Sequence, residues 1–115
     1  MIKRLFALTA ALLLAACSST SPLVDTDYRL DYGALHTDVR FTSGSVTRTG
    51  PGFHQTDAAR IRTLSGDRYF IQWQELDRTF VTLLLDLDEM NVFASILPGR
   101  AESEPMFMAG SVVKR

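Results

Sequence analysis

The segment 69–87 constrains the fold of this chain more than any other, because its apolar residues recur at every second position. Tyr69, Ile71 and Trp73 share one face of an extended chain, and the valine and leucines of 81–87 share one face of the next segment. A connection of three or five residues puts both rows on the same side. The pattern predicts an antiparallel hairpin with an apolar interior face.

The rest of the chain repeats this kind of segment between turn signals. No window after residue 25 sustains the apolar spacing of a helix, whereas glycine, proline and aspartate separate short stretches rich in β-branched and aromatic residues. A meander of seven or eight short strands is expected to curl into a small antiparallel β-barrel, because closure removes exposed edges. The predicted strands are Asp27–Tyr32, Asp38–Thr42, Ser45–Thr49, Ala58–Leu64, Arg68–Glu75, Thr79–Leu87, Asn91–Leu97 and Met106–Val113.

Composition excludes several classes of function. The chain has 115 residues, enough for one domain, and twelve basic against thirteen acidic side chains, which gives no footprint for binding nucleic acid. A single cysteine makes no internal disulfide and no structural zinc site. His36 and His54 are the only histidines, and the acidic patch of Asp86, Asp88 and Glu89 lacks the spacing of a calcium loop. We expect no metal and no cofactor, and we expect Asp86 to point to solvent.

The N-terminal segment is typical of an export signal. Lys3 and Arg4 precede an apolar stretch that ends in small residues, and the polar residues from Ser18 onward end it too early for a bilayer-spanning helix. Leu14-Ala15-Ala16-Cys17 resembles the lipobox of bacterial lipoproteins, in which the signal is removed before the cysteine and the cysteine is acylated. The alternative is an ordinary secretory signal with a chance cysteine.

The lipobox resemblance implies the organisation of the chain and its location. We expect a signal peptide over residues 1–16, a lipidated Cys17 with a flexible tether over 17–25, and a globular domain over 26–115. Acyl chains such as palmitate would hold the protein on a membrane. Ser18 stands where the lipoprotein pattern places Asp for retention at the inner membrane, so the outer membrane, facing the periplasm, is the expected location.

Glu75 continues the inward row of the central hairpin. It follows Trp73 by two residues, so a carboxylate would lie beside an aromatic wall in the barrel interior and could bind or exchange a proton with a polar ligand group. The alternative is a Glu in water beside a turn. Trp73 likewise could serve as core or as pocket wall, since the residues that fill a small barrel also line any pocket in it.

The order and spacing of three segments carry a family resemblance. Thr42-Ser43-Gly44-Ser45-Val46-Thr47-Arg48, Tyr69-Phe70-Ile71-Gln72-Trp73-Gln74-Glu75 and Thr79-Phe80-Val81-Thr82-Leu83 resemble successive strands of the phenolic acid decarboxylases and of the MoaF-like proteins, named for molybdenum cofactor biosynthesis protein F. Both families are small calycin-type barrels, broadly lipocalin-like. The resemblance covers about residues 38–97 and implies the same barrel.

The resemblance implies roles for individual residues. Glu75 matches the carboxylate with which phenolic acid decarboxylases handle their substrate, and Trp73 matches the aromatic residue two positions before it. Arg48 falls one position short of their substrate-carboxylate arginine, where this chain has Thr49, so Arg48 fits only with a bulge or shift. Their paired tyrosines lie on an N-terminal strand, for which Tyr28 and Tyr32 have the wrong spacing.

These observations favour a membrane-anchored lipoprotein whose MoaF-like barrel binds a small, partly apolar molecule. Tyr69, Ile71 and Trp73 would form the wall, Glu75 the polar contact, and Arg48 a contact for an anionic group. One alternative is a lyase acting on a phenolic or related acid with Glu75 as proton donor. Another is an envelope adaptor that binds no ligand and uses its outer surface.

The last strand carries a prediction about assembly. Met106, Phe107 and Met108 are expected to be core or to close the barrel. If the barrel did not close, this edge would pair with a second copy, so the chain is expected to be a monomer or a homodimer.

Overall fold

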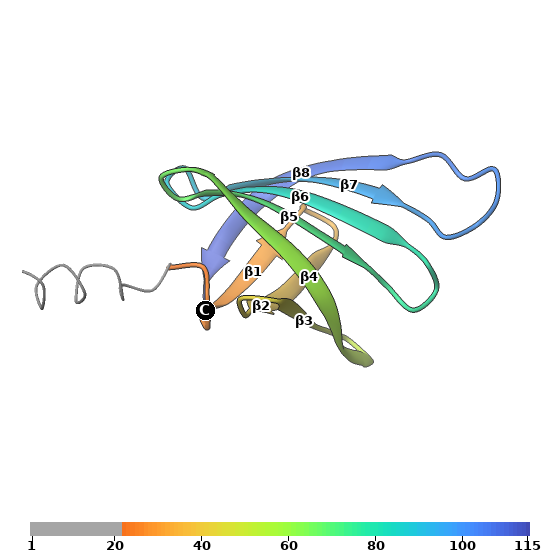
Figure 1. Cartoon of the computed structure of the whole chain (residues 1–115), viewed down its shortest axis with the longest axis horizontal. Helices are drawn as coiled ribbons and strands as arrows, with labels where there is room; N and C mark the ends of the chain where they lie inside the picture. The colour runs from red at the N-terminus through yellow and green to blue at the C-terminus, as the bar shows by residue number, and fades with distance from the viewer. Residues whose placement is uncertain (1–21) are drawn as a thin grey trace, which may run out of the picture.

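The computed structural model describes residues 22–115, and all of its regular structure is β-strand. The elements follow one another along the chain with short connections (Figure 1). The strands are β1 (Asp27–Asp31), β2 (His36–Phe41), β3 (Ser45–Gly50), β4 (Phe53–Ser65), β5 (Arg68–Gln74), β6 (Phe80–Asp86), β7 (Asn91–Leu97) and β8 (Met106–Lys114).

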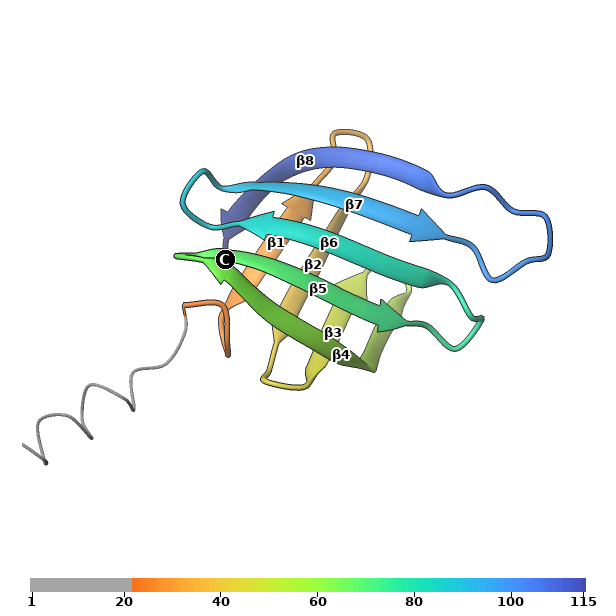
Figure 2. The same cartoon turned by 45° about the horizontal axis from the view of Figure 1, so that its top comes forward.

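The eight strands form a closed antiparallel barrel in which each pairs with its neighbours in sequence. Closure comes from β1 and β8, which pair from Tyr28 opposite Lys114 to Asp31 opposite Ser111. Figures 1 and 2 show the two strands meeting along one side of the barrel. The predicted all-β meander is therefore confirmed, and β8 closes it as expected.

One strand is much longer than predicted. β4 begins at Phe53 rather than at Ala58, because Pro51 and Gly52 form a two-residue turn and the pairing of β3 with β4 starts directly at Gly50 opposite Phe53. The first five residues of β4 are mostly polar and lack the β-branched pattern of the other strands. β4 thereby pairs with β3 through its first half and with β5 through its second.

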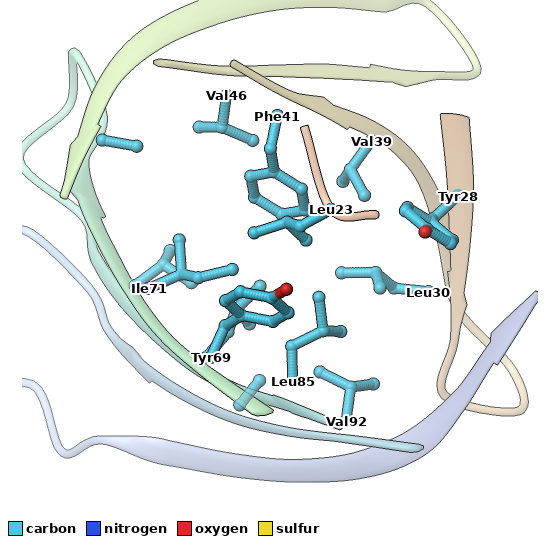
Figure 3. Packing of buried hydrophobic residues seen from close by; sticks show 14 of the residues in the cluster. Leu23, Tyr28, Leu30, Val39, Phe41, Val46, Tyr69, Ile71, Leu85 and Val92 are labelled. Atoms are coloured by element: carbon cyan, nitrogen blue, oxygen red, sulfur yellow. The ribbon is translucent and has the colours of Figure 1, made fainter. Parts of the chain in front are cut away.

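The central hairpin has the predicted geometry. Five residues, 75–79, connect β5 to β6, and Trp73 lies opposite Val81 and Tyr69 opposite Leu85. The alternating residues of both strands point inward and are almost fully buried. Figure 3 shows most of the core that they join. The full set is Leu23, Tyr28, Leu30, Val39, Phe41, Val46, Ala59, Tyr69, Ile71, Trp73, Val81, Leu83, Leu85, Val92, Ala94 and Val112.

Residues 22–25 close one end of the barrel. The side chain of Leu23 is fully buried beside Phe41, and Val24 forms a parallel bridge with Phe41. The Tyr28 hydroxyl donates a hydrogen bond to the Pro22 carbonyl at 2.8 Å. The packed domain thus begins at residue 22, within the segment predicted as tether, because the Leu23 side chain is part of the core.

Two outward-facing positions differ from the sequence predictions. Asp86 does not simply point to solvent: its Oδ1 accepts hydrogen bonds from the backbone N–H groups of Asp88 and Glu89, which lowers the pKa of the Asp86 carboxyl and fixes the β6–β7 turn. Of Met106, Phe107 and Met108, only Met108 packs against the core, and Phe107 is 78% exposed. Adjacent β-residues alternate between the two faces, so the three residues could not all be buried.

Candidate functional site

The end of the barrel opposite Leu23 holds a cavity of about 270 Å³. It lies among the β1–β2, β3–β4 and β5–β6 connections, and this volume is slightly below the roughly 300–1,000 Å³ of pockets for drug-sized ligands. Its walls are mainly apolar, with Arg48 and Glu75 as the charged members. The lining residues are Leu30, Tyr32, Leu35, Thr37, Val39, Arg48, Phe53, Trp73, Glu75, Thr79, Val81, Leu83, Ile96 and Met108.

Arg48 is held between two carboxylates at this end. Its Nη1 lies 2.8 Å from Glu75 Oε2 and its Nη2 lies 3.1 Å from Asp57 Oδ2. Nη2 also donates to Gln55 Oε1 at 3.2 Å. The side chains are only 13% exposed for Arg48, 19% for Glu75 and 7% for Asp57, so the pairs are largely shielded from water. The guanidinium Nε is buried without a hydrogen-bond partner in the described structure.

Arg48 reaches the interior by simple alternation along β3. Val46 is fully buried, and Arg48 follows it by two residues on the same face. β3 pairs with β2 and with β4 without a register shift. The bulge that the sequence comparison required for an inward Arg48 is therefore absent from both pairings, and Arg48 itself, rather than Thr49, occupies the inward position.

Trp73 and Glu75 form one unit with Arg48. The Trp73 indole Nε1 donates a hydrogen bond to Glu75 Oε2 at 3.1 Å, the same oxygen that meets Arg48. Trp73 is 5% exposed and lines the cavity, so it acts both as core and as pocket wall. Glu75 lies just after the end of β5 but is not the solvated turn residue of the alternative interpretation.

The β5–β6 connection fixes Glu75 through backbone contacts. Glu75 N–H donates to the Thr79 carbonyl at 2.8 Å, and Arg78 N–H donates to the Glu75 carbonyl at 2.9 Å. Asp77 Oδ1 accepts from Thr79 N–H, which lowers the pKa of the Asp77 carboxyl. Gly99 packs so closely on this loop that a Cβ there would collide with the Asp77 carbonyl. Glu75 is thus carried by an ordered turn.

Two aromatic rings flank the guanidinium. The Arg48 Cζ lies 5.9 Å from the ring centre of Phe53 and 6.0 Å from that of Trp73, within cation–π range. The Phe53 ring occupies the space beside Gly50, where a Cβ would collide with it. Phe53 is 42% exposed, so it forms the outer edge of the cavity.

Tyr32 is the tyrosine that lines this cavity. Burial raises the pKa of its hydroxyl to about 12. The hydroxyl is therefore neutral at physiological pH and can both donate and accept a hydrogen bond. Tyr28, the other N-terminal tyrosine, lies at the closed end and does not line the cavity.

The structure brings three of the predicted site residues together and separates the others. Arg48, Trp73 and Glu75 meet at the mouth. Tyr69 and Ile71 lie deeper, in the packed half shown in Figure 3, and do not line the cavity. Cys17 lies outside the described residues, so its predicted lipidation stays a prediction.

Asp57, Gln55 and Phe53 are site residues that sequence reasoning missed. All three belong to the part of β4 that was predicted as loop. Asp57 precedes the inward Ala59 by two residues, and that spacing is the signal that could have found it. That spacing predicts an inward Asp57 only if residues 53–57 belong to the strand, which the sequence pattern did not indicate.

Other surfaces of residues 22–115 offer less defined chemistry. A larger concavity of about 470 Å³ includes Asp27, Asp38 and Arg40. The groups there are surface ion pairs, such as Arg29 with Asp38, whose hydrogen bond lowers the pKa of Asp38. Within residues 22–115, no three His, Cys, Asp or Glu side chains converge as metal ligands. No helix in that range is long and apolar enough to cross a membrane.

Comparison with known proteins supports the fold. No family model matches the chain, and no curated protein does either. Among solved structures, the chain is similar to a crystal structure described as "a putative beta-lactamase from Burkholderia vietnamiensis". The TM-score is 0.73 at 18% identity, over 85% of this chain and 100% of the other. At this identity the likeness shows the shared small barrel fold alone.

Proposed function

We propose that the barrel binds a small, partly apolar molecule in the cavity formed by Trp73, Glu75 and Arg48. The observation that supports this most strongly is the contrast within one interior, where the Leu23 end is packed and the opposite end keeps about 270 Å³ beside a charged cluster. Apolar walls with a few convergent polar groups are the usual form of a small-molecule site.

The energetics of the cluster support the same proposal. Removing Arg48, Asp57 and Glu75 from water costs free energy that their mutual attraction often fails to recover, so a buried ion pair is a poor device for stability alone. Apolar residues could fill this end as they fill the other. A set of fixed charges next to open space is better explained by recognition of a ligand.

A cavity-blocking variant tests the proposal. Thr37 lines the cavity, whereas Thr82 lies on the outer side of β6, outside the lining. The neutral probe 3-phenylpropan-1-ol should shift the NMR signals of the Trp73 indole N–H and the Met108 methyl in a saturable way. Thr37→Phe should abolish these shifts, and the matched control Thr82→Phe should retain them. Equal loss in both variants, or no shift in the wild type, would contradict the proposal.

We further propose that the chain is a lipoprotein anchored through Cys17 at the outer membrane, facing the periplasm. The support is the Leu14-Ala15-Ala16-Cys17 sequence after a basic and apolar leader. Bacteria expressing the chain should incorporate labelled palmitate into it, and Cys17→Ser should remove the label while Ser18→Ala keeps it. Label that persists in Cys17→Ser would contradict this anchor.

The MoaF-like relationship is also a proposal, supported by the closed barrel and by the strand spacing from Asp38 to Leu97. The lyase alternative has less support, because decarboxylation needs a cation or a hydroxyl pair to hold the substrate carboxylate. Both terminal nitrogens of Arg48 already meet carboxylates, and of the two N-terminal tyrosines only Tyr32 lines the cavity. Incubation with phenolic acids should release no carbon dioxide. Release that Glu75→Gln abolishes would restore the lyase.

A further inference from the structure

The charges at the cavity mouth define which headgroup fits. Arg48 carries one positive charge, and Glu75 and Asp57 each carry a negative charge when ionised. Among the lining residues, Arg48 and Glu75 are the only Asp, Glu, Lys or Arg side chains. The cluster therefore has an excess of one negative charge.

Glu75 is the group of the cluster best placed to meet a ligand. Its contacts with Arg48 and Trp73 both use Oε2, which leaves Oε1 as the oxygen for a bound molecule. Its side chain is also the most exposed of the three. Asp57, by contrast, lies behind Arg48, does not line the cavity, and serves to neutralise the guanidinium.

An anionic headgroup would meet unfavourable conditions here. It would approach Arg48 only in competition with two carboxylates, and the Arg48 Nε is buried out of its reach. Charge interactions are strong in a site shielded from water, so two like charges within a few ångströms reject such a ligand. A donor with positive charge would instead form a charge-assisted hydrogen bond to Glu75.

The remaining walls define the body of the ligand. Leu30, Val81, Leu83 and Ile96 are apolar, and the cavity is small. The faces of Trp73 and Phe53 near the mouth are already turned to Arg48, so the positive group is held by Glu75 rather than by these rings.

We propose that the ligand class of this cavity is a small monocationic amphiphile: an aryl- or alkyl-ammonium whose N–H donates to Glu75 Oε1 and whose apolar body lies between β1 and β6. This inference rests on the proposed function of the same cavity. It departs from the substrate that the family resemblance implies, because a phenolic acid carries the opposite charge. Asp57 becomes a specificity-determining residue, since it neutralises Arg48 without touching the ligand.

Three probes with one apolar body test the class in the wild-type, full-length chain. These are 3-phenylpropylammonium, 3-phenylpropan-1-ol and 3-phenylpropanoate, titrated at pH 7 by calorimetry and by the fluorescence of Trp73, the only tryptophan. The ammonium should bind at least tenfold more tightly than the alcohol, and the alcohol more tightly than the carboxylate. The order requires no variant to fold.

Two variants that each remove one negative charge distinguish a direct contact with the ligand, at Glu75, from a longer-range electrostatic effect, at Asp57. Glu75→Gln should reduce the preference for the ammonium over the alcohol at least tenfold, whereas Asp57→Asn should reduce it less. The double variant leaves Arg48 without a carboxylate and should prefer 3-phenylpropanoate. Thermal melts of each variant establish that it is folded, and Glu75→Asp, which keeps the charge, should keep the ammonium preference if Glu75→Gln unfolds.

The outcomes distinguish this inference from the proposed function. Tightest binding of the carboxylate, or equal binding of all three probes, overturns the cationic class and leaves a ligand-binding cavity. Failure of all three probes to bind overturns both. An ammonium preference that survives Glu75→Gln in a folded protein overturns the assigned contact.

Discussion

The two halves of the barrel interior follow the same alternation of side chains but are used differently. At the closed half, Leu23, Phe41 and Leu85 are fully buried and leave little room. At the open half, Arg48 and Glu75 occupy the inward positions beside a cavity. The strands are continuous through both, so backbone geometry alone does not decide what the interior does.

The difference shows how dense packing and the proposed binding site are separated within about 90 residues of one small fold. Dense apolar packing at one end supplies free energy of folding, at about 25 cal/mol per Å² of apolar surface buried. The other end can therefore hold desolvated charges and empty space, both of which are unfavourable for folding.

Matched leucine deletions on β6 give the largest expected effect. Leu85→Ala in the packed half should lower the free energy of unfolding by about 3–5 kcal/mol, because it creates a new void. Leu83→Ala should cost less, about 2–3 kcal/mol, because its removed atoms extend an existing cavity. Urea denaturation measures both. Equal costs would mean that the two halves are packed alike.

Removal of the central cation should have the next largest effect. Arg48→Met leaves Asp57 and Glu75 unpaired in a shielded site, and we expect a loss of about 2–4 kcal/mol in the free energy of unfolding. The triple variant Arg48→Met, Asp57→Asn, Glu75→Gln should recover most of it. A single variant as stable as the wild type would show that water already screens these charges.

The stability of the fold at alkaline pH should depend on Tyr32 in the open half more than on Tyr28 in the closed half. The Tyr32 hydroxyl has a pKa of about 12 in the fold and 10.0 as an isolated group. Between these pH values the Tyr32 hydroxyl is deprotonated in the unfolded chain but still protonated in the folded chain. The free energy of unfolding is therefore at its full value below pH 10 and falls by about 2 kcal/mol toward pH 12. Tyr32→Phe should flatten this fall in denaturation curves. Burial also raises the pKa of Tyr28, so a smaller fall remains. Identical pH profiles of wild type and Tyr32→Phe would contradict the burial of that hydroxyl.

The smallest effect is expected at the outer edge of the cavity. Gly50→Ala places a methyl group against the Phe53 ring, which must move, whereas a methyl group at Gly44 meets nothing within 4 Å. Phe53 is half-exposed, so the stability change should stay below about 1 kcal/mol in both variants. Only Gly50→Ala should shift the NMR signal of the Arg48 Nε–H. A shift of the same size in Gly44→Ala would exclude Phe53 as its cause.

Local patterns predicted the strands well, because apolar and polar residues alternate over the few residues of most strands. The inward row of Trp73 and Glu75 follows from the same alternation, as does the side of the sheet on which Val81 lies. The barrel also follows from sequence, since a chain of short strands without helices must cover its edges.

The partners of Arg48 could not be predicted, because they depend on contacts between distant positions. Asp57 meets Arg48 only once the Pro51-Gly52 turn sets the register of β3 against β4, and Glu75, just after β5, meets it from the far side of β4. Leu23 was missed for a related reason, since an isolated leucine before the first strand carries no periodicity. Long-range geometry decided all three.

The position of Leu23 at the closed end also determines where the domain can be attached to a surface or to a fusion partner. The chain enters at residue 22 beneath the barrel, and Arg115 ends at the same side, where its N–H donates to the Asp27 carbonyl. The mouth with Glu75 lies at the far end of the strands. Attachment to a sensor surface through residue 22 or Arg115 should therefore leave the opening unobstructed, which would orient the barrel correctly in a biosensor for the proposed ligand.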